Sequence, residues 1–331
     1  MELLTAIGLL IFGFVILIKG ADFLVEGASA VAKQFNISDM IIGLTIVSFG
    51  TSAPELVVNI DAAMDGKNAM IMGNILGSNI FNTCLILGAA GLIYPLAVQR
   101  ATMSKELPFS VFIVLLMFFL CNDAMFLGGE NMVSFTDGAI LLTLFLGFLA
   151  YVYTSAKGGG NNDEEEEIKS MPLPKSIVLI LLGMVGLVYG GDMVLTNAEF
   201  LAKKFGMTER VIGLTVVAIG TSLPELATSV VAALKKNSDI AVGNVVGSNI
   251  FNILLVLGAS AVFSPNPIAY DVASNFDIYF LLAATALLFS FLFIGTRGRA
   301  DGGTMTYVID KWQAGVLLVA VIGYIIYLLA S

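Results

Sequence analysis

The chain repeats itself at a constant offset of 170 residues, and both copies lie within strongly apolar stretches. The segment Ser48–Leu56 reads SFGTSAPEL and returns 170 residues later as AIGTSLPEL. Eleven of sixteen positions are identical between 41–56 and 211–226, and again eleven of sixteen between 73–88 and 243–258. A gapless repeat of this length indicates two halves with the same fold.

The composition is that of a polytopic membrane protein. Hydrophobic residues make up 58% of the chain, charged residues 12%, and the mean hydropathy is +0.94. A helix needs about 20 apolar residues to cross the roughly 30 Å hydrocarbon layer. The pattern therefore predicts an all-α fold with ten transmembrane helices, over 2–22, 39–64, 69–94, 106–125, 135–154, 175–195, 209–234, 239–264, 276–295 and 312–330.

Five spans per half is an odd number, so the second half must enter the membrane from the side opposite to the first. Inverted five-helix repeats with broken helices at the midplane are typical of secondary transporters, whose substrate site lies between the repeats. The predicted units are a first repeat (1–154, motif 43–56 and 73–82), an acidic linker (155–174) and a second repeat (175–331, motif 213–226 and 243–252).

Basic residues gather in the loops on one side of the predicted spans, which the positive-inside rule assigns to the cytoplasm. One side has Lys33, Arg100, Lys105, Lys157, Lys169, Lys175, Lys235, Lys236, Arg297, Arg299 and Lys311, and the other has Lys67, Lys203, Lys204 and Arg210. We therefore expect both termini to be extracytoplasmic. The acidic linker is expected to be a flexible cytoplasmic spacer, because its consecutive acids lack the spacing of a calcium-binding loop.

Each copy of the repeated motif places one glutamate at membrane depth. A charge there costs roughly 2.5 to 3.5 kcal/mol, so Glu55 and Glu225 need a compensating ligand, most simply a cation. Thr51 and Ser52 lie four and three residues before Glu55, so that their hydroxyls share its helix face. Pro54 has no N–H, which releases a carbonyl of the preceding turn as a further ligand.

The second copy repeats this arrangement, and a second pair of segments adds more oxygen donors. The candidate side chains of the second copy and of this pair are Thr221, Ser222, Ser78, Asn82, Ser248 and Asn252. Glycines in these segments allow the helices to pack closely. The remaining motif asparagines are expected to face away from the Ser78/Asn82 face and to serve packing or capping; they are Asn74, Asn79, Asn244 and Asn249.

The available donors are hard oxygens, which favour calcium or sodium over zinc or copper. Histidine is absent, and Cys84 and Cys121 are predicted to be ordinary buried residues. Two glutamates carry the charge that one calcium ion balances. No cofactor is predicted, and the net charge of −9 argues against a nucleic-acid partner. The expected partners are the transported ions and the lipid bilayer, and no protein partner is indicated.

At these motifs the chain resembles the sodium/calcium exchanger family of the calcium/cation antiporter superfamily. The patterns Gly-Thr-Ser-x-Pro-Glu and Gly-Asn-x-x-Gly-Ser-Asn-Ile occur in both halves, and the likeness covers essentially the whole chain. The chain looks like a short prokaryotic-type member without the large calcium-sensing domains of animal exchangers. The resemblance implies exchange of calcium for sodium by alternating access across the plasma membrane.

The resemblance also implies roles for individual residues. Calcium would bind Glu55 and Glu225, with backbone carbonyls near Ser48 and Ala218 completing its shell. Sodium would occupy overlapping sites around Thr51, Ser52, Ser78, Thr221, Ser222 and Ser248. Some relatives have an aspartate where this chain has Asn252, which removes a possible third carboxylate. The first helix of each half, beginning near Glu2 and Lys175, would slide across the rest.

Other functions remain open on the sequence alone. Two carboxylates in one low-dielectric cavity repel each other, so protons could replace sodium as the counter-ion. Exchange of another cation, or potassium-dependent sodium/calcium exchange, would use the same oxygens. An intramembrane enzyme could also use paired acids, but acid/base chemistry needs two carboxylates in different environments, and a repeat makes them equivalent. We expect a transporter and not an enzyme.

Overall fold

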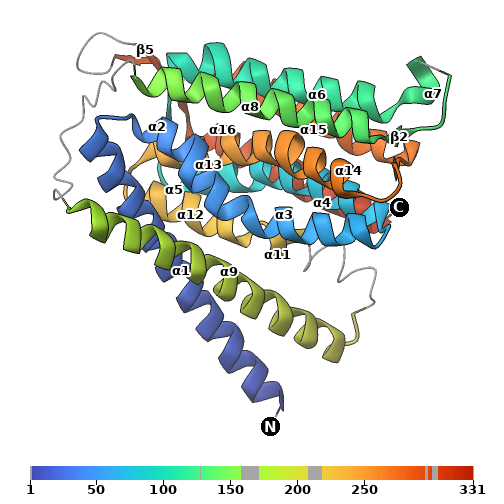
Figure 1. Ribbon diagram of the computed structural model, residues 1–331. Coiled ribbons are helices and arrows are strands. Elements are labelled where there is room, and N and C mark those ends of the chain that lie inside the picture. The colour runs from blue at the N-terminus through green and yellow to red at the C-terminus, as the bar shows by residue number, and fades with distance from the viewer. Residues whose placement is uncertain are drawn as a thin grey trace.

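A computed structural model describes residues 2–126, 128–157, 171–207, 218–294, 297–299 and 305–330. It is a bundle of helices with two small sheets at its ends (Figure 1). Among the described residues, nine helices are long and apolar enough to cross a membrane. The all-α polytopic membrane fold predicted from the sequence is therefore confirmed.

The long helices of the two halves follow one another in the same order, whereas the short elements differ. The first half consists of α1 (Glu2–Phe35), α2 (Asp39–Ile42), η1 (Gly43–Val47), α3 (Ser48–Met64), α4 (Asn68–Ile80), η2 (Phe81–Ile86), α5 (Leu87–Ile93), β1 (Leu96–Gln99), η3 (Thr102–Glu106), α6 (Leu107–Cys121), α7 (Asp123–Phe126), β2 (Met132–Val133) and α8 (Phe135–Lys157).

The second half follows residues 158–170, which lie outside the described residues together with most of the predicted acidic linker. Its elements are α9 (Leu173–Lys204), α11 (Ala218–Thr221), α12 (Leu223–Leu234), α13 (Ser238–Phe251), η5 (Asn252–Leu257), α14 (Gly258–Phe263), β3 (Ile268–Ala269), η6 (Val272–Ser274), α15 (Asn275–Ile294), β4 (Arg297–Arg299), β5 (Met305–Ile309) and α16 (Lys311–Ala330).

The first helices of the two halves, α1 and α9, pack against each other along one side of the bundle (Figure 1). Their contact is lined by glycines. A Cβ added at Gly20 would lie 2.8 Å from the backbone of Gly186, and one at Gly190 would lie 2.6 Å from the backbone nitrogen of Leu17. Such close approach between helices requires residues without side chains.

These two helices are longer than the sequence predicts. α1 has 34 residues and α9 has 32, whereas the hydropathy pattern predicted 2–22 and 175–195. At 1.5 Å per residue both measure about 50 Å, well beyond the roughly 30 Å hydrocarbon layer. Charged residues such as Lys19 and Asp22 end the apolar pattern, but they do not end a helix, because they are compatible with helical geometry.

The motif helices form the interior of the bundle. α3 and α4 of the first half pack against α12 and α13 of the second, and most of α13 is buried. A Cβ at Gly247 in α13 would lie 2.2 Å from the hydroxyl of Ser48, and one at Gly43 would lie 3.1 Å from the Cα of Gly243. The glycines of one repeat thus allow contact with the other.

π-helical segments occur within the motif helices and were not foreseen from the sequence. η1 precedes α3, whereas η2 and η5 lie at equivalent places in the two halves and contain Asn82 and Asn252. The hydroxyl of Ser48, the first residue of α3, donates to the carbonyl of Gly43 in η1, five residues earlier, at 2.7 Å. π-segments within helices are rare and are frequently found at functional sites.

The fold also contains two small sheets that the sequence did not predict. β1 pairs antiparallel with β5, which pairs with β4, so that a three-stranded sheet joins the two halves. At the other end of the bundle β2 pairs with β3, again from different halves. β1, β5 and β4 are four, five and three residues long, and β2 and β3 have two residues each. Such strands are too short for a period-two pattern to stand out.

Candidate functional site

The two motif glutamates lie in the buried interior, one from each repeat. The exposed fraction is 2% for Glu55 in α3 and 1% for Glu225 in α12. The Ser52 hydroxyl donates to Glu225 Oε1 at 3.2 Å, so the first repeat reaches directly into the carboxylate of the second.

Many buried polar atoms of the motif helices have no hydrogen-bond partner within the described protein. Buried polar groups are nearly always paired, so a group of unpaired ones marks a place where a ligand can bind. The unpaired atoms in the motif helices include Glu55 Oε1 and Oε2, Glu225 Oε2, the Ser222 hydroxyl, and both side-chain polar atoms of Asn82 and Asn252. Carboxylate, hydroxyl and amide oxygens form a donor set that suits a hard cation.

The described residues hold no cluster of three or more histidine, cysteine or acidic side chains. A cation at the glutamate pair would therefore take its remaining ligands from neutral oxygens. Calcium accepts six to eight oxygen ligands in irregular geometry, and backbone and amide carbonyls are among its usual donors. The composition of the site is consistent with calcium or sodium and unlike a thiolate or imidazole site.

Ser48 and Thr51 connect α3 to α13 of the other repeat. The Ser48 hydroxyl lies 3.1 Å from the backbone oxygen of Asn244. Thr51 Oγ1 donates to Asn244 Oδ1 at 3.1 Å and lies 3.3 Å from the Ser248 hydroxyl. The backbone carbonyl of Ser48, which the resemblance implied as a ligand, lies 3.2 Å from Thr51 Oγ1.

Asn244 is a central residue of this network, and the expectation that it faces away was wrong. Its Nδ2 donates to the backbone oxygen of Glu225 at 3.2 Å and to the Ser229 hydroxyl at 3.0 Å, while its Oδ1 accepts from Thr51. One side chain on α13 thus connects α3 with α12. The sequence signal was present, because Asn244 lies four residues before Ser248 and hence on the same helix face.

The other motif asparagines have smaller roles. Asn74, the counterpart of Asn244, accepts from the Ser78 hydroxyl at 3.2 Å, within its own helix. Asn79 donates to the backbone oxygen of Ile75 at 2.7 Å, and Asn249 donates to Thr83 Oγ1 at 2.9 Å. The bond to Ser78 shows that the expectation that Asn74 faces away from the Ser78/Asn82 face was also wrong. The contacts of Asn79 and Asn249 agree with packing roles.

The proline of the motif stands in different surroundings in the two repeats. α3 continues through Pro54 without ending, contrary to the expected break, and the irregular backbone is the π-segment η1 before it. In the second repeat, α11 ends at Thr221 and α12 begins at Leu223, so the helix breaks at Ser222 (φ −91°, ψ 7°). Pro224 is therefore in the first turn of α12, where proline is well tolerated.

Two residues of the predicted site, Ala218 and Thr221, lie at the two ends of α11, just before the helix break. Ala218 begins α11 directly after 208–217, which lie outside the described residues, as does the start of the predicted span 209–234. Thr221 closes α11, partly buried and next to the break. Both residues precede Glu225 in the chain, at the positions that Ser48 and Thr51 occupy in the first repeat.

Several known proteins are similar to this chain in sequence or fold over nearly their whole length. The family model described as sodium/calcium exchanger protein matches residues 5–154 and 175–330. CaxA of Alkalimonas amylolytica is 39% identical over 329 residues, covering 97% of this chain and 98% of its own. The sodium/calcium exchanger MaX1 of Methanosarcina acetivorans is 30% identical over 353 residues, covering 97% of both chains.

A solved structure of the sodium-calcium exchanger NCX_Mj, soaked with zero sodium and calcium, superposes with a TM-score of 0.78 at 28% identity and covers 98% of each chain. The family match, the relatives and the fold agree with the paired motifs and with the buried glutamates contributed by inverted halves. The chain belongs to the sodium/calcium exchanger protein family, a family of membrane transporters that exchange calcium against another cation.

Proposed function

We propose that the chain is a sodium/calcium antiporter whose ion site is formed by Glu55 and Glu225. The observation that supports this most directly is the pair of buried carboxylates, contributed by opposite repeats and accompanied by unpaired hydroxyl and amide oxygens in the motif helices. Two carboxylates at membrane depth are stable only when a cation or a proton neutralises them. One calcium ion balances both charges.

Calcium binds between Glu55 and Glu225, with the carbonyls near Ser48 and Ala218 as further ligands. Sodium ions occupy overlapping positions, so that the two ions compete for one set of oxygens. The hydroxyl and amide side chains proposed to surround the ions are those of Thr51, Ser52, Ser78, Asn82, Thr221, Ser222, Ser248 and Asn252. Because Asn252 is neutral, it contributes an oxygen without adding a third negative charge.

Exchange follows from the charge of the empty site. With calcium or sodium bound, the two carboxylates are neutralised and the protein can change between states open to either side of the membrane. Without a cation, two buried charges repel each other and oppose that change. The carrier therefore moves ions in both directions but resists returning empty, which produces antiport and not leak.

The proposed topology follows the distribution of basic residues. The loops at the end of the bundle where α1 ends and α12 meets α13 are rich in lysine and arginine, which assigns them to the cytoplasm of a cell with this protein in its plasma membrane. Both termini are then extracytoplasmic, and the acidic linker 155–174 is cytoplasmic. The repeats 1–154 and 175–331 each contribute one glutamate to the site.

The direct test is uptake of radiolabelled calcium into proteoliposomes loaded with sodium, compared with vesicles loaded with potassium or choline. Uptake that requires internal sodium supports the proposal. A Glu55→Gln or Glu225→Gln variant should then lose uptake, while Glu106→Gln, a buried glutamate at the start of the α6 segment that bonds to Tyr151, should keep it. Sodium-dependent uptake that survives in Glu55→Gln would contradict the assigned site.

A second candidate, proton/calcium exchange, has one observation in its favour. Neither carboxylate oxygen of Glu55 accepts a hydrogen bond from the described protein, and a proton would stabilise such a group as a cation would. Vesicles with an acidic, sodium-free interior test it. Uptake driven only by that interior would replace sodium with protons as the counter-ion. Adding potassium to sodium-loaded vesicles tests for potassium-dependent exchange.

A further inference from the structure

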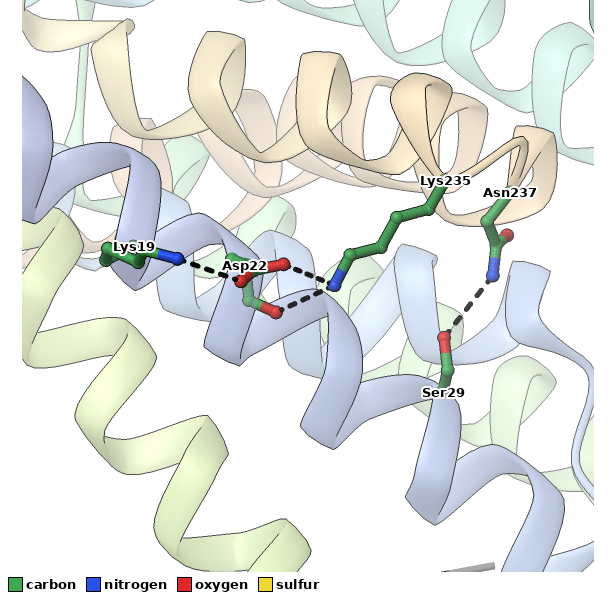
Figure 2. A network of polar contacts seen from close by, with 5 residues as sticks. All are labelled: Lys19, Asp22, Ser29, Lys235 and Asn237. Atoms are coloured by element: carbon green, nitrogen blue, oxygen red, sulfur yellow. Dashed lines mark hydrogen bonds and ion pairs between the residues drawn. The ribbon is translucent and has the colours of Figure 1, made fainter. Parts of the chain in front are cut away.

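The corner between α12 and α13 holds α1 through an ion pair (Figure 2). Lys235 Nζ lies 2.5 Å from Asp22 Oδ1 and donates to the backbone oxygen of Asp22 at 3.2 Å. Both side chains are about one-third exposed, at 36% and 33%. Lys19 lies on the same helix, 3.8 Å from the other carboxylate oxygen of Asp22. The ion pair joins the first helix of one repeat to the motif helices of the other.

A second contact at the same corner extends this attachment along α1. Asn237 Nδ2 lies 3.3 Å from the Ser29 hydroxyl, two helical turns beyond Asp22, and also donates to Asp39 Oδ2 at 2.5 Å. Asn237 is the N-cap of α13, where its Oδ1 accepts from the backbone nitrogen of Ile240. The corner therefore contacts α1 at two points, Asp22 and Ser29, and is itself fixed by its capping geometry.

The repeat provides the corresponding corner at the other end of the bundle, between α3 and α4. Subtracting 170 from Lys235 gives Asp65, and adding 170 to Asp22 gives Asp192, which is exposed. The charge of the corner residue is therefore reversed while that of the helix residue is kept. Lys67, the counterpart of Asn237, forms an ion pair with Asp65 at 2.7 Å inside this corner.

In a transporter built from inverted repeats, alternating access arises when one part moves against the rest around a fixed site. In the opposite state each repeat takes the conformation of the other, so α9 meets the α3–α4 corner as α1 now meets the α12–α13 corner. Asp192 then faces Asp65, two like charges. Adding 170 to Ser29 gives Glu199, so the counterpart of the Asn237–Ser29 contact pairs Lys67 with Glu199. Forming it requires Lys67 to leave Asp65.

We propose that the ion pair of Asp22 and Lys235 is a one-sided clasp that favours the state described here, in which α1 is held at the α12–α13 corner. The inference rests on the proposed antiport, because it concerns which side of the membrane the ion site faces. An ion pair of this exposure changes a population ratio by about two- to fivefold. Without it, more of the protein adopts the opposite state.

The test measures distances and needs no transport. Nitroxide labels are placed at Met64→Cys and Phe205→Cys, at the ends of α3 and α9, in a chain with Cys84→Ala and Cys121→Ala. The matched pair at the other end is Leu234→Cys with Phe35→Cys; all four label positions are more than half exposed.

In the opposite state, the labels at positions 64 and 205 should lie as far apart as those at positions 234 and 35 lie in the state described here. Spin-label distance measurements report the population at that separation. Asp22→Asn and Lys235→Gln should each raise the population at that separation about two- to fivefold. Lys236→Gln, which removes the same charge from the neighbouring residue, should leave it unchanged, and the exchanged pair Asp22→Lys with Lys235→Asp should restore the original ratio.

Asp65→Lys places a lysine where Asp192 arrives, so it should raise the same population with the Asp22–Lys235 pair intact. Equal distributions for the parent chain, Lys235→Gln and Asp65→Lys would overturn the clasp. The readout also separates the two proposals. If calcium exchange is absent but the distances respond, the proposed function alone fails. If exchange is present and the distances do not respond, the clasp alone fails.

Discussion

Glu55 and Glu225 occupy the same position in the two copies of the motif, yet the protein holds their carboxylates differently. Glu225 accepts a hydrogen bond from Ser52, whereas the equivalent hydroxyl of Ser222 and both oxygens of Glu55 have no partner in the described protein. Glu225 also lies in the first turn of α12, where the helix dipole stabilises a negative charge. Glu55 lies inside α3, away from either end.

The same asymmetry extends to the residues behind the glutamates. The backbone oxygen of Glu55 accepts from Asn59 in its own helix, at 2.7 Å. That of Glu225 accepts from Asn244 of α13, because Ser229 stands where Asn59 stands in the first repeat. An internal repeat thus duplicates the ligands, but single substitutions around them give each ligand its own support. Equivalent positions are therefore expected to respond differently to mutation.

The largest effect is expected where the repeats should behave alike. Glu55→Gln and Glu225→Gln each remove one of two charges that hold the ion, so calcium affinity should fall by about 100-fold or more. Calcium-dependent thermal stabilisation in detergent would measure it. A loss confined to one of the two variants would show that the ion binds a single carboxylate. It would contradict the expectation that the two glutamates contribute alike.

A packing difference should be nearly as large. A Cβ at Gly247 would lie 2.2 Å from the Ser48 hydroxyl, whereas one at its counterpart Gly77 meets nothing within 4 Å. Gly247→Ala should lower the free energy of unfolding by about 1–3 kcal/mol through overpacking. Gly77→Ala should be neutral or slightly stabilising, because alanine favours the helix. Thermal melting of both variants without cations checks this, and equal melting temperatures would contradict it.

The next smaller difference between the repeats is expected for Asn244 and its counterpart Asn74. Asn244 links Thr51 with the Glu225 backbone, while Asn74 bonds within its own helix. Asn244→Ala should weaken calcium binding by about tenfold, as removal of groups that orient ligands commonly does. Asn74→Ala should weaken it less than about threefold. Binding measured by competition with sodium would sharpen the comparison, and the reverse order would refute it.

The smallest expected difference concerns the motif serines. Ser52→Ala removes the hydrogen bond to Glu225 and should destabilise the cation-free protein by about 1 kcal/mol. Ser222→Ala removes a hydroxyl with no partner in the described protein and should leave the cation-free melting temperature unchanged while reducing affinity for calcium. Melting curves with and without calcium separate these effects. A cation-free Ser222→Ala protein that melts as low as Ser52→Ala would contradict this account.

Much of the fold could be predicted from the sequence because its signals are strong and local. Apolar segments of the length of a bilayer define the helices, and the 170-residue repeat defines the inverted halves. The motif residues around the glutamates were identified because hydroxyls, amides and carboxylates are costly at membrane depth and therefore conspicuous.

What could not be predicted depends on contacts between segments far apart in the chain. The π-segments that contain Asn82 and Asn252 have sequences that read as ordinary helix. The strands that join the two halves pair across more than 130 residues, β2 with β3 and β1 with β5. The role of Asn244 becomes apparent only when α3 and α12 are seen on either side of α13. The lengths of α1 and α9 were underestimated because hydropathy reports where apolar residues end and not where a helix ends.

The glycine-lined contact between α1 and α9 has a mechanical consequence. Backbones in contact at Gly20 and Gly190 leave no side chains that could slide past one another, so we expect the two helices to move as a single rigid lever. When this rigid pair of helices moves toward one end of the bundle, it must move away from the other end. The geometry of that one seam would then ensure that an ion path to one side of the membrane opens only as the path to the other side closes.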